Sequence, residues 1–146
     1  MKKIRFSIIT DVHLFLRKDN KILLLLRENT GYEDGNYHVP AGHMDGNEKV
    51  TTALIREAKE EIGITILPEN CKLVHVMHSK TNNERMGFFF EVKQWKGKVT
   101  NMEPNKCGAL TWFDINELPG NMVMYARYAI ERYKKMNYCL NMDGNT

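Results

Sequence analysis

The sequence predicts one α/β domain, residues 1–146, in which a mixed β-sheet lies between helices. Three observations lead to this fold class. The segments read in the order strands, helix, strands, helix. An apolar content of 42% is enough to bury a core. No repeat, low-complexity segment or Pro/Gly/Ser-rich linker divides the chain.

The first third of the chain is predicted to be sheet. Residues 5–16 mix β-branched and aromatic side chains, residues 18–21 are turn-like, and residues 21–27 are nearly all aliphatic, which indicates a hairpin with a buried second strand. After a loop with two glycines, residues 37–39 form a short strand. It stops at Pro40, because proline lacks a ladder donor and restricts the residue before it.

A helix is predicted over residues 46–62. Asp45 followed three residues later by Glu48 resembles a capping box at its start. Gly63 stands where a left-handed residue ends a helix. Both ends of this helix are therefore marked in the sequence.

The second half repeats the pattern of strands followed by a helix. Residues 73–79 and 86–95 are predicted strands that run antiparallel across a turn at 81–84. A further strand covers 110–114, and an amphipathic helix covers 121–135. The final ten residues are expected to fray.

Composition excludes several classes of function. Twenty-one Lys and Arg against 18 Asp and Glu leave a net charge of +3, too little for a surface that binds duplex nucleic acid. The longest aliphatic run, residues 22–26, is far shorter than the about 20 apolar residues that span a membrane. The basic start resembles a secretion signal, but Asp11 and His13 interrupt it and no cleavage site follows.

The three cysteines fit a reducing cytoplasm. They are odd in number and widely spaced, so they match neither a disulfide framework nor a CxxC metal site: Cys71, Cys107 and Cys139. A cytoplasmic protein is therefore expected. Nine methionines and the amphipathic final helix would permit a homodimer interface.

The predicted first helix carries charge beside its core face. At about 100° per residue, one arc holds Val50, Leu54, Ile55, Ala58 and Ile62. The neighbouring arc holds Glu57, Glu60 and Glu61. Carboxylates at i, i+3 and i+4 repel one another by a few tenths of a kcal/mol per pair.

Two explanations fit this cluster of glutamates. Mg²⁺ binds carboxylate oxygens together with water and substrate phosphates, so bound cations would offset the repulsion. Alternatively, Arg56 and Lys59 neutralise the glutamates and the cluster is an ordinary solvated face.

The wider pattern favours the first explanation. Residues 42–64 read GHMDGNEKVTTALIREAKEEIGI and resemble the Nudix box, G-x5-E-x7-R-E-U-x-E-E-x-G-U, where U is a bulky aliphatic residue. Only Ala58 is smaller than usual. The preceding YHVPAG and the later segments 103–107 (EPNKC), 112–113 (WF) and 117–119 (ELP) are also similar to small Nudix proteins, so the resemblance covers residues 6–133.

The resemblance implies a fold and a reaction. The fold is the Nudix fold, an α/β/α sandwich on a mixed sheet. The activity is that of MutT-like pyrophosphohydrolases, which use Mg²⁺ or Mn²⁺ to cleave the diphosphate linkage of a small-molecule nucleotide substrate. Metal ions would neutralise phosphate oxygens and activate a water for in-line attack on phosphorus.

Roles follow residue by residue from the same resemblance. Glu57 and Glu61 would be the main metal ligands, with Glu60 as an additional ligand or water-positioning group and the carbonyl of Ala41 completing the site. Arg56 would orient the glutamates, and Glu48 would support Arg56. The general base lies either in the box or in a later loop, and our candidate for the later loop is Glu103, whose alternative is a solvated loop carboxylate.

The substrate-binding residues are weaker candidates. Arg27 resembles an arginine that contacts substrate phosphate in some mutator-type members, although an exposed strand-end arginine explains it equally well. His43 lies near the expected phosphates or in solvent. Tyr37 is one of four aromatics that are candidates for stacking on a base or for the core, with Tyr32, Phe88 and Phe90.

Three further histidines are assigned to packing. They lie on predicted strands without the spacing of metal ligands: His38, His75 and His78.

The EPNKC and WF segments favour free (deoxy)nucleoside triphosphates as substrates. Two other readings stay open. A non-catalytic Nudix-fold nucleotide sensor is disfavoured by the intact box and the short chain. An isoprenoid diphosphate isomerase is disfavoured by the absence of a cysteine near the box.

Overall fold

The computed structural model describes residues 3–80 and 83–142. The elements alternate as the sequence predicts, strands and a helix followed by strands and a helix. In chain order they are β1 Ile9–Lys18, β2 Lys21–Arg27, β3 Tyr37–His38, β4 Ala41–His43, α1 Val50–Ile62, a 3-10 turn at Pro68–Asn70, β5 Lys72–Ser79, β6 Arg85–Val92, β7 Cys107–Asp114 and α2 Met124–Met142.

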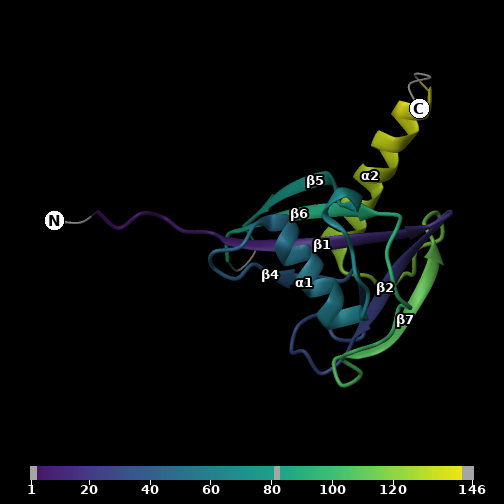
Figure 1. Ribbon diagram of the computed structural model, residues 1–146, viewed down its shortest axis with the longest axis horizontal. Helices are drawn as coiled ribbons and strands as arrows, with labels where there is room; N and C mark the ends of the chain where they lie inside the picture. Colours follow the sequence, from purple (N-terminus) through teal and green to yellow (C-terminus); the bar gives the residue numbers. More distant parts are fainter. Residues whose placement is uncertain (1–2, 81–82, 143–146) are drawn as a thin grey trace.

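Strand β1 lies at the centre of the sheet, between β2 and β6 (Figure 1). The strand order is β3-β2-β1-β6-β5. Strand β1 pairs in parallel with β6, from Ile9 opposite Arg85 to Leu16 opposite Val92. All other pairs are antiparallel: β1 with β2, β1 with β4, β2 with β3 and β7, and β5 with β6. The sheet is therefore mixed, as predicted.

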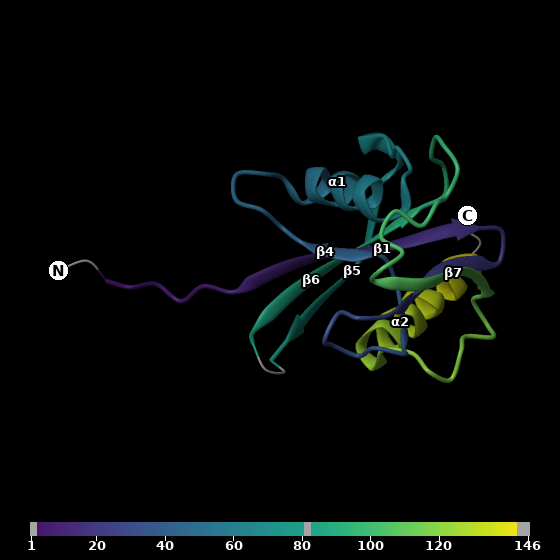
Figure 2. The ribbon, with the colours of Figure 1, turned by 90° about the horizontal axis from the view of Figure 1, so that it is seen from below.

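The two helices cover opposite faces of this sheet (Figure 2). Alternate residues of β1 face opposite sides, so Val12 and Leu14 pack with Leu54 of α1 while Phe15 packs with Ile130 of α2. Each face has its own buried apolar cluster. The predicted α/β/α sandwich is confirmed.

Helix α1 begins later than predicted. It starts at Val50, and Lys49 caps it without a side-chain hydrogen bond, so the expected start at residue 46 was wrong. The Asp45 N–H does donate to Glu48 Oε1 (2.6 Å), but this bond closes a turn before the helix. Asn47 in that turn has φ 63°, which a helix does not allow.

The predicted end of α1 is confirmed. Gly63 has φ 72°, and its N–H donates to Lys59 O. An L side chain at this angle would be strained, which is why glycine suits the position.

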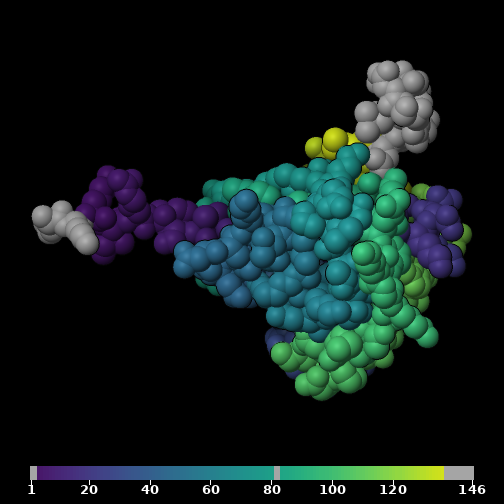
Figure 3. Space-filling view, in the orientation of Figure 1, coloured from purple at the N-terminus to yellow at the C-terminus, as the bar shows by residue number. Residues whose placement is uncertain are grey.

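Other boundaries also moved. Strand β1 starts at Ile9, and residues 3–8 extend from the body without regular structure (Figures 1 and 3). The helix expected over 121–135 starts at Met124 and continues to Met142, through residues expected to fray. The predicted turn at 81–84 lies partly outside the described residues.

Within the described residues, neither helix is both long and apolar enough to cross a bilayer. Cys71 and Cys107 are free thiols.

Two histidines are buried on the α2 face, where β1 and β3 meet the helix. Burial lowers the pKa of His13 from 6.5 to about 4, although the Asp11 charge opposes the shift. Burial likewise holds the pKa of His38 well below its usual value. Both rings are therefore neutral at neutral pH.

This burial predicts a specific pH dependence of stability. Between pH 6.5 and 4 the unfolded His13 binds a proton that the folded protein excludes, so stability falls as the pH decreases through that window. From pH 7 to pH 5 we expect a loss of about 2 kcal/mol from His13. Urea unfolding at the two pH values, in wild type and His13→Leu, measures it. An unchanged pH dependence in the variant would contradict the assignment.

A polar network fastens α2 to the sheet. Tyr133 is 1% exposed, and its hydroxyl donates to the Glu91 carboxylate of β6 and accepts from Arg17 Nη1 of β1 (2.6 Å). The Arg17 guanidinium also lies 5.5 Å from the centre of the Tyr133 ring. One hydroxyl thus joins two strands to the helix.

Tyr133→Phe should destabilise the fold. The variant keeps the ring but leaves the buried Glu91 without its tyrosine donor, which should cost about 1–3 kcal/mol. The matched control is Tyr128→Phe, since Tyr128 lies on the same helix and is 53% exposed. Chemical denaturation of both variants checks the prediction, and equal midpoints would refute it.

Candidate active site

The site forms where α1 packs against β4. Strand β4 is held on β1 by pairing of Ala41 with His13 and of Gly42 with Val12. Because Gly42 has no side chain, the Glu57 carboxylate can lie directly against the strand. A Cβ at Gly42 would overlap that carboxylate. The first glycine of the motif therefore makes room for an acidic group.

The second carboxylate of the pair touches the same strand. Glu61 Oε2 accepts a hydrogen bond from the Ala41 N–H (3.3 Å). Burial raises the pKa of Glu61 well above its usual value, and the charges of Glu57 and Glu103 raise it further. Glu61 therefore lies in a site with excess negative charge.

Glu57 is more strongly compensated. Burial raises its pKa, while Arg56 opposes the shift through an ion pair at 2.8 Å. Glu60 and Glu103 again push the pKa upward. The net shift is still upward, so the Arg56 contact does not fully offset burial and the neighbouring carboxylates.

Arg56 is the link between the helix and the preceding turn. Its Nη2 donates to Glu48 Oε1 (2.8 Å) and to the His43 carbonyl (3.1 Å), and its Nε donates to Glu48 Oε2 (3.3 Å). The bond to Glu48 is the largest of the effects that raise the pKa of Arg56. The guanidinium is thus held in one orientation beside Glu57.

Glu60 differs from the other two glutamates of the motif. Its side chain is 53% exposed, and its nearest ionic partner is Arg56 at 3.4 Å. It lies at the outer rim of the site, where it meets solvent.

Glu103 lies near the glutamates despite a separation of more than 40 residues. The Met102 N–H donates to the Glu61 carbonyl (3.1 Å), which ties this loop to the end of α1. The Glu103 N–H is held by Asn101 Oδ1 (3.1 Å). The charge of Glu103 raises the pKa of both Glu57 and Glu61, so the loop places a further carboxylate within electrostatic range of the site.

The donor set fits a hard divalent cation. Within the described part of the chain, no three acidic, histidine or cysteine side chains converge as a ready-made metal cluster. Glu57 and Glu61 nevertheless supply two carboxylates with raised pKa beside the β4 backbone. A bound cation would stabilise the charged form of both. Magnesium in particular needs only one or two carboxylates, with water and phosphate completing its shell.

The predicted substrate residues have different surroundings. Arg27 Nε donates to the Tyr32 carbonyl (2.7 Å), and the charge of Arg27 lowers the pKa of Glu61. His43 is 67% exposed and lies 2.5 Å from Asp11. The Tyr37 ring packs edge-on against Phe113, 4.9 Å between centroids, at the border of the second core.

The sequence interpretation missed a group of polar residues on the α2 face of β1. Asp11 there accepts bonds from Arg85 Nη1 (3.2 and 3.1 Å) and contacts His43. His13 and Tyr125 lie next to it, with ring centroids 5.8 Å apart. The available signal was an aspartate and a histidine inside an otherwise apolar strand.

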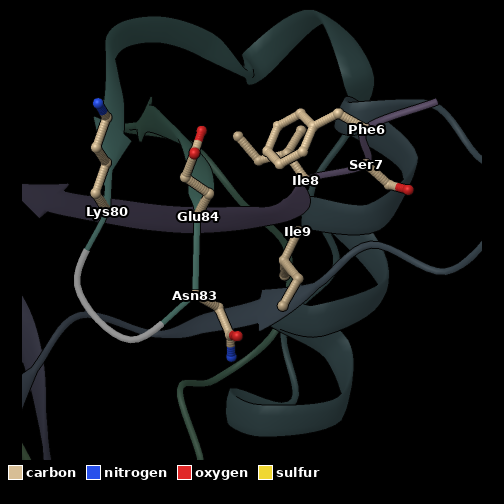
Figure 4. Close-up of a pocket in the computed structure, with 7 residues that line it drawn as sticks. All are labelled: Phe6, Ser7, Ile8, Ile9, Lys80, Asn83 and Glu84. Atoms are coloured by element: carbon tan, nitrogen blue, oxygen red, sulfur yellow. The ribbon is translucent and has the colours of Figure 1, made fainter.

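A surface pocket lies elsewhere, at the start of β1 (Figure 4). Its lining is Phe6, Ser7, Ile8, Ile9, Lys80, Asn83 and Glu84. The one carboxylate among them, Glu84, is bonded to His78 (2.8 Å). None of the motif's glutamates lines this pocket, so the acidic site is separate from it.

Known proteins related to this chain include the following three. An uncharacterized Nudix hydrolase, YvcI of Bacillus subtilis, is 32% identical over 107 residues, 70% of this chain and 64% of the relative. An ADP-ribose pyrophosphatase of Methanocaldococcus jannaschii is 32% identical over 107 residues, 71% of this chain and 60% of the relative. An 8-oxo-dGTP diphosphatase of Proteus vulgaris is 32% identical over 84 residues, 57% and 73% of the two chains. The matched region thus spans less than two thirds of the first two relatives.

Solved structures share the fold. A MutT NUDIX hydrolase from Burkholderia pseudomallei superposes with a TM-score of 0.79 at 25% identity, covering 87% of this chain and 98% of that one. A MutT protein from Methanosarcina mazei gives 0.78 at 20% identity, covering 92% and 99%. The NUDIX domain family model matches residues 9–133, nearly the whole described chain. The chain therefore belongs to the NUDIX domain family.

Proposed function

We propose that this protein is a Mg²⁺-dependent pyrophosphohydrolase that cleaves the diphosphate linkage of a nucleotide derivative. The observation that carries the proposal is the pair Glu57 and Glu61. Both carboxylates are held against the β4 backbone, at Gly42 and Ala41, and their pKa values are raised by burial and by neighbouring carboxylates. Such a pair would bind a divalent cation together with the phosphates of a substrate.

The residues of the chain have distinct roles in this proposal. A bound Mg²⁺ would neutralise phosphate oxygens and acidify an attacking water. Arg56 engages Oε1 of Glu57 and so fixes the direction of that carboxylate. The Ala41 N–H does the same for Glu61. Glu103, from the loop tied to α1, accepts the proton of the attacking water.

The substrate is proposed to be a nucleoside triphosphate or its deoxy form. The EPNKC and WF segments support this class. One relative is named as an 8-oxo-dGTP diphosphatase, and 8-oxo-dGTP is a deoxynucleoside triphosphate. Another is named as an ADP-ribose pyrophosphatase, which makes ADP-ribose the main alternative substrate. Mn²⁺ is expected to replace Mg²⁺, since it shares the preference for oxygen ligands.

Glu57→Gln and Glu61→Gln should each lower kcat at least about a hundredfold, because each removes a charge that would hold the cation. Phosphate or pyrophosphate release from a panel of nucleoside triphosphates and ADP-ribose, with Mg²⁺ and then Mn²⁺, measures the effect.

The control for these variants is Glu131→Gln, a change of an exposed glutamate on α2. Its turnover should equal that of wild type. Full turnover by the Glu57 and Glu61 variants would refute the proposed site. Nucleotide binding without any release by wild type would instead favour a sensor.

Gly42→Ala gives an independent test of the site geometry. The new Cβ would occupy the space of the Glu57 carboxylate, the flexible end of a side chain that can move aside. We expect turnover to fall at least about tenfold while stability changes by less than about 1 kcal/mol. Steady-state kinetics and urea unfolding on the same preparation separate the two effects. Wild-type turnover would show that the position of the Glu57 carboxylate is unimportant.

A further inference from the structure

A cluster of polar side chains interrupts the core on the α2 face of the sheet. We call it the polar cluster: Asp11 and His13 of β1, His38 of β3 and Tyr125 of α2. On β1, Asp11 and His13 stand on either side of Val12 and precede Phe15, where the apolar core of this face begins. His13 and His38 are buried, the Asp11 side chain is 12% exposed, and Tyr125 is half-buried. Asp11 and Tyr125 are thus the members of the cluster that keep some exposed surface.

The cluster is not optimised for packing. His13 stacks on Phe89, with ring centroids 4.2 Å apart and an angle of 9° between the planes. Its Nδ1 is buried and has no hydrogen-bond partner among the described residues. A buried polar atom of this kind destabilises a fold, and such costs are typical of functional sites.

The hydrogen bonds fix the tautomer of His38. The Val39 N–H donates to His38 Nδ1 (2.8 Å), so Nδ1 is an acceptor and carries no proton. The proton of the neutral ring is therefore on Nε2. That nitrogen lies 2.7 Å from the Tyr125 hydroxyl and must donate to it.

The direction of the His38–Tyr125 hydrogen bond leaves the Tyr125 hydroxyl hydrogen for another acceptor. Its oxygen already accepts from His38, so its own O–H hydrogen is directed to a different partner. No second hydrogen bond of Tyr125 is found among the described residues. The hydroxyl is consequently a donor that a buried histidine holds in place, on a half-buried ring.

Asp11 supplies the complementary acceptor. It lies two residues before His13 on the same face of β1. Arg85 bonds both of its carboxylate oxygens, and His43 contacts only Oδ1. A carboxylate has about four acceptor positions. One position on Oδ2 thus stays available for a donor from a ligand.

The polar cluster adjoins the acidic site. His13 pairs with Ala41, whose N–H binds Glu61, and neighbouring strands lie about 4.8 Å apart. The charge of Arg27 lowers the pKa of Glu61 and also that of His38 and of Tyr125. The arginine therefore lies within electrostatic range of both the acidic site and the polar cluster. Ala41 thus contacts Glu61 and pairs with the strand that carries Asp11 and His13.

We propose that Tyr125 is a specificity-determining residue that donates a hydrogen bond to an acceptor on the base or sugar attached to the diphosphate. Asp11 accepts from an N–H or O–H on the same group, and His38 is a positioning residue that turns the Tyr125 hydroxyl toward it. This inference rests on the proposed function for the location of the phosphates. The recognised group is one that presents an acceptor beside a donor, as the edges of the bases and the sugar hydroxyls do.

The test is binding, so that it does not depend on turnover. The probes are α,β-methylene analogues of the four deoxynucleoside triphosphates and of ADP-ribose, an abasic deoxyribose triphosphate, and tripolyphosphate, each titrated calorimetrically with Mg²⁺. Tyr125→Phe should weaken the tightest-bound analogue about fivefold to tenfold and leave tripolyphosphate unchanged. A loss that persists with the abasic compound assigns the contact to the sugar, and a loss confined to whole nucleotides assigns it to the base.

His38 is tested by rescue. His38→Leu should weaken the same analogue about as much as Tyr125→Phe, whereas His38→Gln keeps an N–H donor and should recover most of the affinity. Tyr128→Phe, on the exposed side of α2, is the matched control and should bind as wild type does. Urea unfolding of each variant separates loss of fold from loss of the contact.

Two results would overturn the inference. One is equal affinity of wild type and Tyr125→Phe for every probe, and the other is an equal loss for tripolyphosphate, which would place the effect at the phosphates. Failure of wild type to bind any analogue also counts against it. The proposed hydrolysis fails separately, if wild type binds the natural nucleotides but releases no phosphate.

Discussion

The close approach of helix α1 to the backbone of strand β4 is the constraint on which the site depends. Gly42 lets the Glu57 carboxylate lie against the strand, and the Ala41 N–H holds Glu61 there. Both carboxylates lose water in this arrangement, which raises their pKa values. The packing of Leu54 and Ala58 under the same helix supplies the burial energy that holds this unfavourable pair together.

The central strand extends this constraint to the other face of the sheet. Because β1 pairs with β4 on one side and with β6 on the other, it has no free edge over residues 11–13, and its side chains must point to one face of the sheet or the other. The side chains on the α1 face are apolar and support that helix. Those on the α2 face begin with Asp11 and His13 and become apolar only at Phe15. The strand therefore carries a support for the helix on one face and a polar surface on the other.

Local patterns predicted most of the fold and the acidic half of the site. The hairpin at 18–21, the end of α1 at Gly63 and the face of Glu57 and Glu61 each depend on a few neighbouring residues, so the sequence could reveal them. The start of α1 could not be found in this way. The Asp45–Glu48 spacing resembles a capping box, but the bond between these residues closes a turn before the helix, which begins at Val50. Strand β4 was missed because its three residues become a strand only through their partner β1.

The polar cluster shows why half of a site can be invisible in a motif. Its members come from β1, β3 and α2, so their proximity depends on strand register and on how the last helix docks. The motif, by contrast, is one continuous segment that must place charges at fixed helical spacing. Cleavage of a diphosphate needs the same charges whatever the attached group is, whereas recognition needs donors and acceptors that match that group. A fold that builds the first function from one helix and the second from dispersed elements can change its substrate without changing its chemistry.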